Sequence, residues 1–148
     1  MTVVEVELPA ERSRLCELVL RDLPEWFGSK EATAAYIRDV AKLPTFRISD
    51  DAFLSLKLHT PLAAEVYVMG VRRANQRQGL GSTLLRAGEA YLRASGVEYL
   101  QVKTLGPSDP DVGYANTRSF YLARGFVPLE EIHGLWEHNP CLLLVKRL

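Results

Sequence analysis

The sequence predicts an α/β fold of the α+β type, in which one mixed β-sheet is flanked by helices. Along the 148 residues, the spacing of apolar side chains changes repeatedly between the helical period and the alternation of strands. The resulting order, β-α-α-β-β-β-α-β-α-β-β, requires hairpins as well as longer crossovers, which together give a mixed sheet. No repeat or linker divides the sequence, so we expect a single domain over residues 1–148.

The first third of the chain predicts one strand and two helices. We expect the strand over residues 2–6. Apolar residues recur at the helical period over residues 10–23, and Pro24 ends this helix. Ser29 is suited to cap the second helix, because its hydroxyl accepts a hydrogen bond from the first turn, and Pro44 stops it.

The middle of the chain predicts three strands. Two of them cover residues 45–48 and 52–58, on either side of a short turn at 49–51. The third is more apolar, covers residues 64–71 and follows a loop at 59–61.

The clearest helical pattern covers residues 80–94. Leu80, Leu84 and Tyr91 lie on one apolar stripe, and charged residues occupy the other face. Gly88 inside this helix indicates close packing on the sheet. The remaining expected elements are a strand over 98–105, a loop over 106–113, a helix over 114–124, and strands over 126–132 and 141–146.

The composition excludes several classes of partner. Lys+Arg and Asp+Glu are both 18, so the formal net charge is zero, whereas nucleic-acid-binding proteins usually carry a basic excess. Cys16 and Cys141 are expected to be buried free thiols. Neither a signal peptide nor an apolar stretch of membrane-spanning length is present, so we expect a cytoplasmic protein with no nucleic-acid or membrane partner.

The polar turn before the helix at 80–94 is suited to bind an anion. Gly79 and Gly81 allow backbone N–H groups to approach a ligand closely. These groups are the free donors at the positive end of the helix dipole, where a pyrophosphate binds well. Arg77 would add a charge, and Ser82 and Thr83 would add hydroxyl donors.

Two other phosphate-binding patterns do not fit this turn. A P-loop needs a lysine directly after its second glycine, where this chain has Ser82. A dinucleotide-binding turn needs a small residue where this chain has Leu84. The glycines by themselves are equally compatible with a plain strand-to-helix turn.

Three segments extend the pattern over most of the chain. They are Val68-Met69-Gly70-Val71, Gln76-Arg77-Gln78-Gly79-Leu80-Gly81 and Ser119-Phe120-Tyr121-x-x-x-Gly125-Phe126. In this order and spacing they resemble the GCN5-related N-acetyltransferase (GNAT) superfamily, whose element order is also the one predicted above. The turn at 49–51 is shorter than the hairpin that family members often have, which leaves the local shape of the sheet open.

The resemblance implies acetyl-CoA as cosubstrate and no metal. The family places this molecule where two parallel strands splay apart, here 64–71 and 98–105. The pantetheine arm would bind to the backbone of Met69 and Val71, and the pyrophosphate to the turn that follows. The implied cofactor-binding residues are Met69, Gly70, Val71, Gln76, Arg77, Gln78, Gly79, Leu80, Gly81, Ser82, Thr83, Asn116 and Tyr121.

Aminolysis of a thioester needs a neutral amine and a protonated thiol leaving group. Tyr121 is the implied general acid. A phenol has a reference pKa of about 10 and a thiol one of about 8.5, so a positioned tyrosine can share its proton with the departing thiolate or return a proton to it. Glu65 is the candidate general base, and it resembles the base of the histone acetyltransferase branch. A strand-end or substrate-anchoring carboxylate is an equally good interpretation. His59, His133 and His138 are weaker candidates, since a lone loop histidine is usually solvated.

The acceptor site is expected at loops 24–28 and 132–140. Its implied substrate-binding residues are Trp26, Phe27, Glu65, His133 and Trp136. Exposed aromatic rings can wall a pocket or hold a cation, although each ring is also compatible with a role as a cap on the core. No acidic cluster marks a polycationic acceptor.

The sequence and the resemblance together indicate an acetyl-CoA-dependent N-acetyltransferase. We expect it to act on the primary amine of a small molecule, by direct attack of the amine on the thioester. A non-catalytic acyl-CoA-binding regulatory module and a protein or peptide acetyltransferase are the alternatives. Homodimers are common in the family, and the sequence leaves this point and the identity of the acceptor open.

Overall fold

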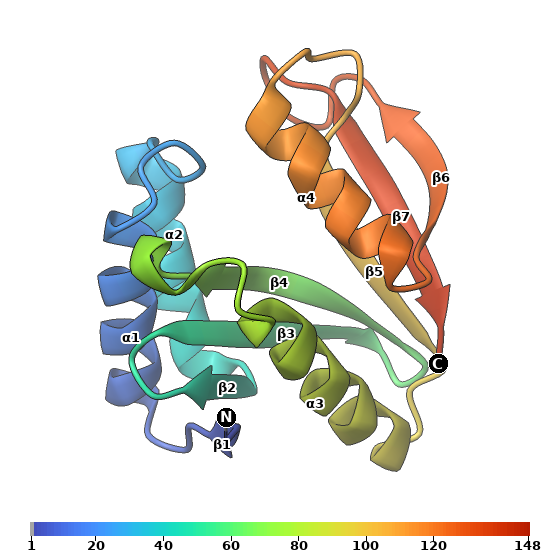
Figure 1. Cartoon of the computed structure of the whole chain (residues 1–148). Coiled ribbons are helices and arrows are strands. Elements are labelled where there is room, and N and C mark those ends of the chain that lie inside the picture. The colour runs from blue at the N-terminus through green and yellow to red at the C-terminus, as the bar shows by residue number, and fades with distance from the viewer. Residues whose placement is uncertain (1) are drawn as a thin grey trace. The chain divides into compact units, whose positions relative to one another are not determined.

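The helices and strands follow one another in the predicted order (Figure 1). The computed structural model describes residues 2–148, and its seven strands form one mixed sheet in the order β1-β2-β3-β4-β5-β7-β6. The strands are β1 (Val4–Glu5), β2 (Thr45–Ile48), β3 (Ala52–Thr60), β4 (Ala63–Val71), β5 (Tyr99–Leu105), β6 (Val127–Ile132) and β7 (Cys141–Arg147). The helices are α1 (Pro9–Arg21), α2 (Lys30–Asp39), α3 (Leu80–Ala94) and α4 (Val112–Ala123).

The predicted α/β order is confirmed, with small differences at the ends of elements. The Ser29 hydroxyl accepts a hydrogen bond of 3.2 Å from Ala32 N, which is the predicted cap of α2. The predicted loop at 59–61 is wrong, because β3 continues through Thr60. Two short 3₁₀ turns, Val40–Lys42 and Arg73–Asn75, have no counterpart in the predicted elements.

β4 and β5 pair in parallel, whereas β1 with β2, β2 with β3, β5 with β7, and β6 with β7 pair antiparallel. Within the described residues, the β4–β5 ladder has three residue pairs and ends at Glu65↔Gln101. β4 nevertheless continues to Val71. The backbone groups on this edge of β4 beyond Glu65 are therefore not used by a ladder with β5.

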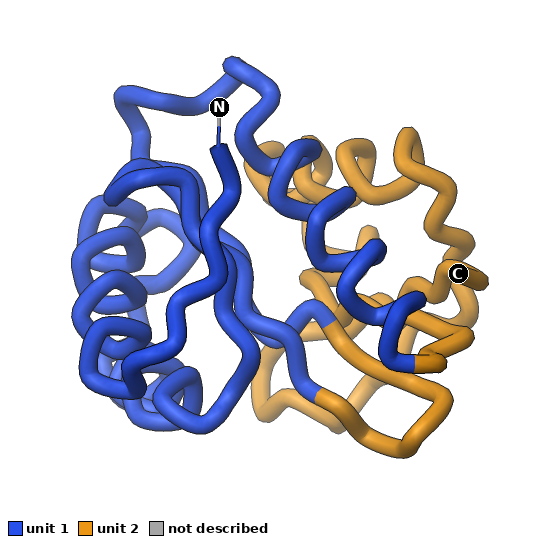
Figure 2. The backbone as a smooth tube through the Cα atoms, turned by 90° about the horizontal axis from the view of Figure 1, so that it is seen from below, with its two compact units in different colours: residues 1–57, 66–95 blue, residues 58–65, 96–148 orange. Residues whose placement is uncertain are grey.

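The chain divides into two compact units (Figure 2). Unit 1 comprises Met1–Lys57 and Val66–Ser95, and unit 2 comprises Leu58–Glu65 and Gly96–Leu148.

Unit 1 has helices on both faces of its strands (Figure 1). Phe53 packs into the core cluster with α1, whereas its neighbour Leu54 lies under α3. This difference follows from the alternation of side chains along a strand. A Cβ on Gly88 would lie 2.7 Å from Leu54 Cδ2, so α3 approaches β3 closely where the sequence predicted it.

The short turn between β2 and β3 does not disturb their pairing. Ile48 pairs with Ala52, and the register is regular from there to Thr45↔Ser55. Ser49 adopts a left-handed backbone conformation with φ 45° in this turn. The shape of the sheet is therefore regular at the point where the comparison with the GNAT pattern had left it open.

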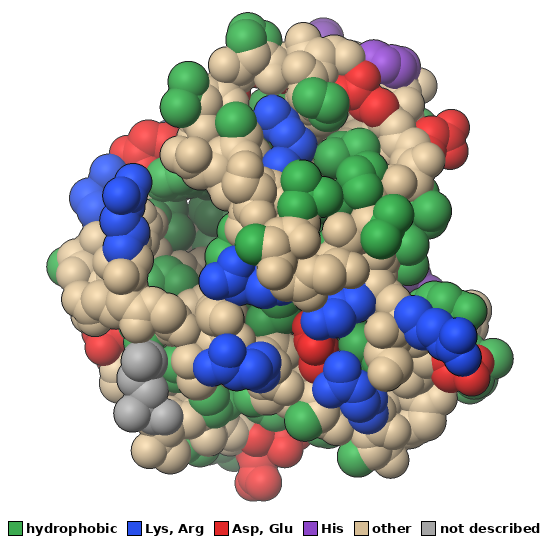
Figure 3. Space-filling view, turned by 45° about the vertical axis from the view of Figure 1, so that its right-hand side comes forward, with side chains coloured by type: hydrophobic (Ala, Val, Ile, Leu, Met, Phe, Trp, Pro, Cys, Tyr) green, Lys and Arg blue, Asp and Glu red, His purple; other side chains and the backbone are tan. Residues whose placement is uncertain are grey.

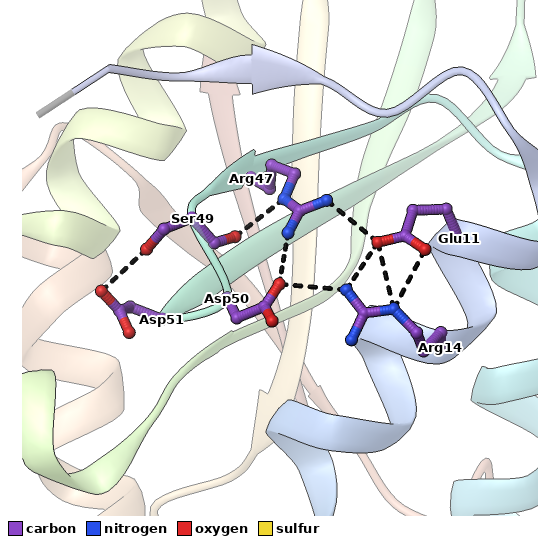
Figure 4. Close-up of polar contacts among 6 residues, drawn as sticks. All are labelled: Glu11, Arg14, Arg47, Ser49, Asp50 and Asp51. Atoms are coloured by element: carbon purple, nitrogen blue, oxygen red, sulfur yellow. Dashed lines mark hydrogen bonds and ion pairs between the residues drawn. The ribbon is translucent and has the colours of Figure 1, made fainter.

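An ionic network joins this turn to α1 (Figure 4). Arg14 donates to Glu11 and, at 3.0 Å, to Asp50, and Arg47 contacts both carboxylates. The hydrogen bond from Arg14, followed by that from Arg47, lowers the pKa of Glu11 from 4.5 to about 2. The stability that this shift contributes is present above pH 4.5 and is lost as the pH falls towards 2.

Unit 2 is built on the antiparallel strands β5, β7 and β6, with α4 against β5. Tyr121 and Phe126 contact each other in its interior, with ring centroids 5.3 Å apart. Cys141 of this unit and Cys16 of unit 1 are both buried and free, as predicted.

The charged side chains on the face drawn in Figure 3 are dispersed. Figure 3 shows Lys and Arg side chains as separate groups on the face that it draws, with acidic and apolar side chains between them. None of the helices within residues 2–148 combines the length and the apolar character needed to cross a membrane.

Gly70 on β4 is required by the packing of α1. A Cβ at this position would lie 2.8 Å from Val19 Cγ1, and valine has little rotamer freedom to move away. We therefore expect Gly70→Ala to lower the free energy of unfolding by about 1–3 kcal/mol, as overpacking usually does. Urea denaturation measures this change. In the control, Val19→Ala added to Gly70→Ala should cost less than the sum of the two single changes, and strict additivity would contradict the proposed contact.

Candidate active site

The start of α3 presents free backbone donors. Gly79 is its N-cap, with φ 80°, and Arg77 also has a positive φ of 63°. The first amide of α3 with an intrahelical acceptor is that of Thr83, which donates to Gly79 O, so the three amides before it are free at the positive end of a 15-residue helix. Gln76 Nε2 donates to Val71 O at 3.1 Å and ties the turn to the end of β4. This is the geometry of an anion-binding turn.

Only one of the three arginines around this turn is free of carboxylates. Arg73 forms an ion pair with Glu25, and its backbone N–H donates to Asp22 at 2.7 Å. Arg72 Nε lies 4.0 Å from the same Asp22 carboxylate. Among the described residues, no acidic side chain pairs with Arg77. Its charge is therefore the one available to a bound anion.

The two hydroxyl groups of the first turn differ in availability. Thr83 Oγ1 donates its proton to Gly79 O at 2.9 Å, so it is not a donor for a ligand in this conformation. Ser82 Oγ accepts from Arg86 Nη1 at 3.3 Å and keeps its own proton for a ligand. This contact places Arg86, a charged residue of α3, beside the turn.

The segment of β4 predicted to bind the pantetheine arm is packed against α1 and α2. Tyr67 donates a hydrogen bond to Asp39 at the end of α2, and Gly70 lies against Val19 of α1. Met69, whose backbone was predicted to bind this arm, lies between these two packed residues and is partly exposed.

Glu65 lies at the centre of a polar cluster in unit 2. Its side chain is 10% exposed, and its Oε1 lies 2.6 Å from His59 Nε2 and 3.3 Å from Lys103 Nζ. Both contacts use the same oxygen. Within the described part of the chain, Oε2 has no hydrogen-bond partner, so one carboxylate oxygen is fixed and the other is open to a proton or a water.

The structure changes the interpretation of His59. The sequence placed it in a loop as a weak candidate, but it lies on β3 and contacts Glu65. In the neutral tautomer that carries its proton on Nε2, His59 donates to Glu65, and its Nδ1 can accept a hydrogen bond. His133 and His138 remain exposed, at 67% and 83%, beside Glu131 and Glu137.

Tyr121 lies on α4 between two phenylalanine rings. The ring centroids are 5.1 Å from Phe120 and 5.3 Å from Phe126. Burial raises the pKa of Tyr121 well above its usual value of 10, which keeps the phenol protonated at neutral pH. Its hydroxyl makes no hydrogen bond to any side chain or backbone group that the structure describes. Asn116, one turn earlier on α4, is exposed.

The predicted acceptor walls belong to different units. Trp26 and Phe27 pack against the core cluster of unit 1 and are partly exposed, and Phe27 contacts Tyr36 edge to face at 6.0 Å. His133 is exposed and Trp136 is partly buried in unit 2. Trp26 and Phe27 therefore do cap the core, and a role of these four residues in acceptor binding stays a prediction.

Comparison with known proteins decides the family. A model of the acetyltransferase (GNAT) family matches residues 14–126. The chain belongs to the GNAT family. No curated protein sequence matches it.

Solved structures show the same GNAT fold. A GNAT-family protein from Desulfovibrio desulfuricans has a TM-score of 0.82 at 16% identity, with 99% of both chains covered. An aminoglycoside 6'-N-acetyltransferase complexed with coenzyme A has a TM-score of 0.74 at 14% identity, with 99% of this chain and 97% of that chain covered. A GNAT acetyltransferase from Elizabethkingia anophelis with acetyl-CoA bound has a TM-score of 0.70 at 15% identity, with the same coverage. At these identities the likeness establishes the fold alone.

The predicted site residues of this GNAT chain are divided between the two units. Unit 1 holds the β4 segment and the anion-binding turn, and unit 2 holds Glu65 and Tyr121. Sequence reasoning missed Lys103 as a partner of Glu65, and no local pattern around Lys103 marks it. Within residues 2–148, no group of three or more His, Cys, Asp or Glu side chains is arranged to hold a metal ion.

Arg77 provides a direct test of the anion-binding turn. Arg77→Ala should weaken the binding of CoA about tenfold, because one charge-assisted contact to phosphate is lost. Isothermal titration calorimetry measures the affinity. Arg73→Ala is the matched control, since Glu25 already neutralises that side chain. Equal losses of CoA affinity in both variants would contradict a specific role of Arg77 in binding the anion.

Proposed function

We propose that this GNAT acetyltransferase uses acetyl-CoA to acetylate the primary amine of a small molecule, by direct attack of the amine on the thioester. The observation that carries the proposal is the carboxylate of Glu65. It is nearly buried, held at one oxygen by His59 and Lys103, and open at the other. A fixed acceptor of this kind is what removal of an ammonium proton requires.

The turn before α3 would hold the pyrophosphate of acetyl-CoA. Its free amides and Arg77 supply the donors, and the edge of β4 beyond Glu65 leaves backbone groups for the pantetheine amides. Acetyl-CoA or CoA is present in several of the similar structures, which supports the same cosubstrate here.

Tyr121 is the proposed source of the proton for the leaving thiolate. Its raised pKa keeps the phenol neutral, but it also makes complete proton transfer to a thiolate unfavourable. We therefore assign to Tyr121 a hydrogen bond to sulfur that strengthens as negative charge develops, which stabilises the transition state more than the ground state.

A small-molecule acceptor is favoured by the comparison with two aminoglycoside N-acetyltransferases of similar fold. An aminoglycoside itself is a poor expectation for this chain, because a polycation needs several acidic side chains around it. Glu65 already has two basic partners.

Steady-state release of CoA over a panel of primary amines tests the proposal, with Glu65→Gln as the key variant. A general base should lose at least about 100-fold in kcat, with a changed pH profile. A substrate anchor should instead raise KM. Glu130→Gln, the same substitution at an exposed position on β6, is the control.

Two outcomes would favour the alternative functions. If acetyl-CoA stabilises the protein thermally but no amine releases CoA, the chain is a binding module. Turnover confined to peptides identifies a protein acetyltransferase.

Tyr121→Phe tests the acid separately. Because Tyr121 is packed by Phe120 and Phe126 and its hydroxyl has no protein partner among the described residues, the variant should fold with little change in thermal stability. We expect kcat to fall about 100-fold. Full turnover on an accepted amine would remove Tyr121 from the mechanism.

A further inference from the structure

Unit 1 contains a cavity of about 290 Å³ that the proposed chemistry has not used. Its lining residues are Arg38, Asp39, Lys42, Leu43, Lys57 and Tyr67. They come from the end of α2, the 3₁₀ turn after it, β3 and β4. The volume is near the lower end of the range for small-ligand sites, which suits a compact group better than a large one.

The charge of the lining is predominantly positive. Arg38 Nε donates to Asp39 Oδ1 at 3.2 Å, so these two charges compensate each other. Lys42 and Lys57 have no carboxylate oxygen within 4.0 Å among the residues that the structure describes. Two ammonium groups therefore border one small cavity without a close ion pair, although the charge of Lys57 also helps to lower the pKa of Asp39.

The acidic side chain of the cavity is already bonded. Tyr67 donates to Asp39 Oδ2 at 2.6 Å, and Lys57 Nζ lies 5.6 Å from the centre of the Tyr67 ring. The hydrogen bond from Tyr67 and the contact with Arg38 lower the pKa of Asp39, and burial together with this hydrogen bond raises the pKa of Tyr67. The pair is thus fixed as phenol and carboxylate at neutral pH, and Asp39 is engaged through both oxygens.

We propose that this cavity binds the anionic group of the acceptor, so that the substrates are small amines bearing a carboxylate or a phosphate monoester. Lys42 and Lys57 would hold the anion, and the Tyr67–Asp39 pair would form one wall. This inference rests on the proposed function. The acceptor is the ligand that fits because Tyr67 of the cavity lies on β4, two residues before Met69, whose backbone is the predicted site of the pantetheine arm.

The test compares four short primary amines that differ only in the distal group: aminopropyl phosphate, 4-aminobutyrate, aminopropanol and diaminopropane. CoA release is measured for the wild type and for Lys42→Glu, Lys57→Glu and Lys30→Glu. Lys30 is an exposed lysine at the start of α2, outside the cavity, and matches the change in net charge. For the wild type we expect a lower KM for the two anionic amines than for the other two. That KM should rise about tenfold in Lys42→Glu and Lys57→Glu but not in Lys30→Glu.

A second readout keeps this inference separate from the transfer reaction. Thermal stabilisation by aminopropyl phosphate and by 4-aminobutyrate is measured with CoA saturating, so that phosphate cannot act at the cofactor turn. Stabilisation that is lost in both cavity variants but kept in Lys30→Glu supports the anion site even if no amine is acetylated. Equal use of aminopropanol or diaminopropane with no effect of the cavity variants overturns it, as does the absence of both stabilisation and turnover. Comparison of the phosphate-bearing amine with the carboxylate-bearing amine shows which of the two anions the cavity binds.

Discussion

The burial of Glu65 sets the main constraint on the first half of β4. A carboxylate that is removed from water is costly unless hydrogen bonds and opposite charges compensate it. His59 on β3 and Lys103 on β5 supply that compensation from the two strands beside β4. The ladder with β5 then stops at Glu65↔Gln101, so the same residue marks the point beyond which the backbone groups of β4 on this edge are not paired with β5.

The anion-binding turn depends on a different kind of constraint. Arg77 and Gly79 both adopt positive φ, and this conformation aims successive N–H groups outward before α3 begins. Only some of the polar groups nearby serve a ligand, however. Arg72 and Arg73 are neutralised by Asp22 and Glu25, and these contacts fix the end of α1 to the turn. Charge composition alone would have assigned all three arginines to the ligand.

The distinction between free and paired charges also bears on which acceptor the protein would bind. Similar structures include enzymes for aminoglycosides, which are polycations. In this chain, the acidic groups around β4 already have close partners inside the protein, whereas the two lysines bordering the cavity form no ion pair among the described residues. Fold likeness at 14–16% identity gives no information on this difference, because acceptor recognition depends on individual side chains rather than on the fold.

The sequence by itself determined the order of the elements, the cap at Ser29, the bounds of α3 and the glycine turn that precedes it. These features depend on apolar periodicity, capping and glycine placement, whose physical causes act within one or two turns of chain. It also carried the resemblance to the family, which the match over residues 14–126 confirms. Only the tertiary structure decided the partners of Glu65 and the free charges of the cavity. Lys103 lies 38 residues from Glu65, and the two meet because strand register brings them together, which no local pattern specifies.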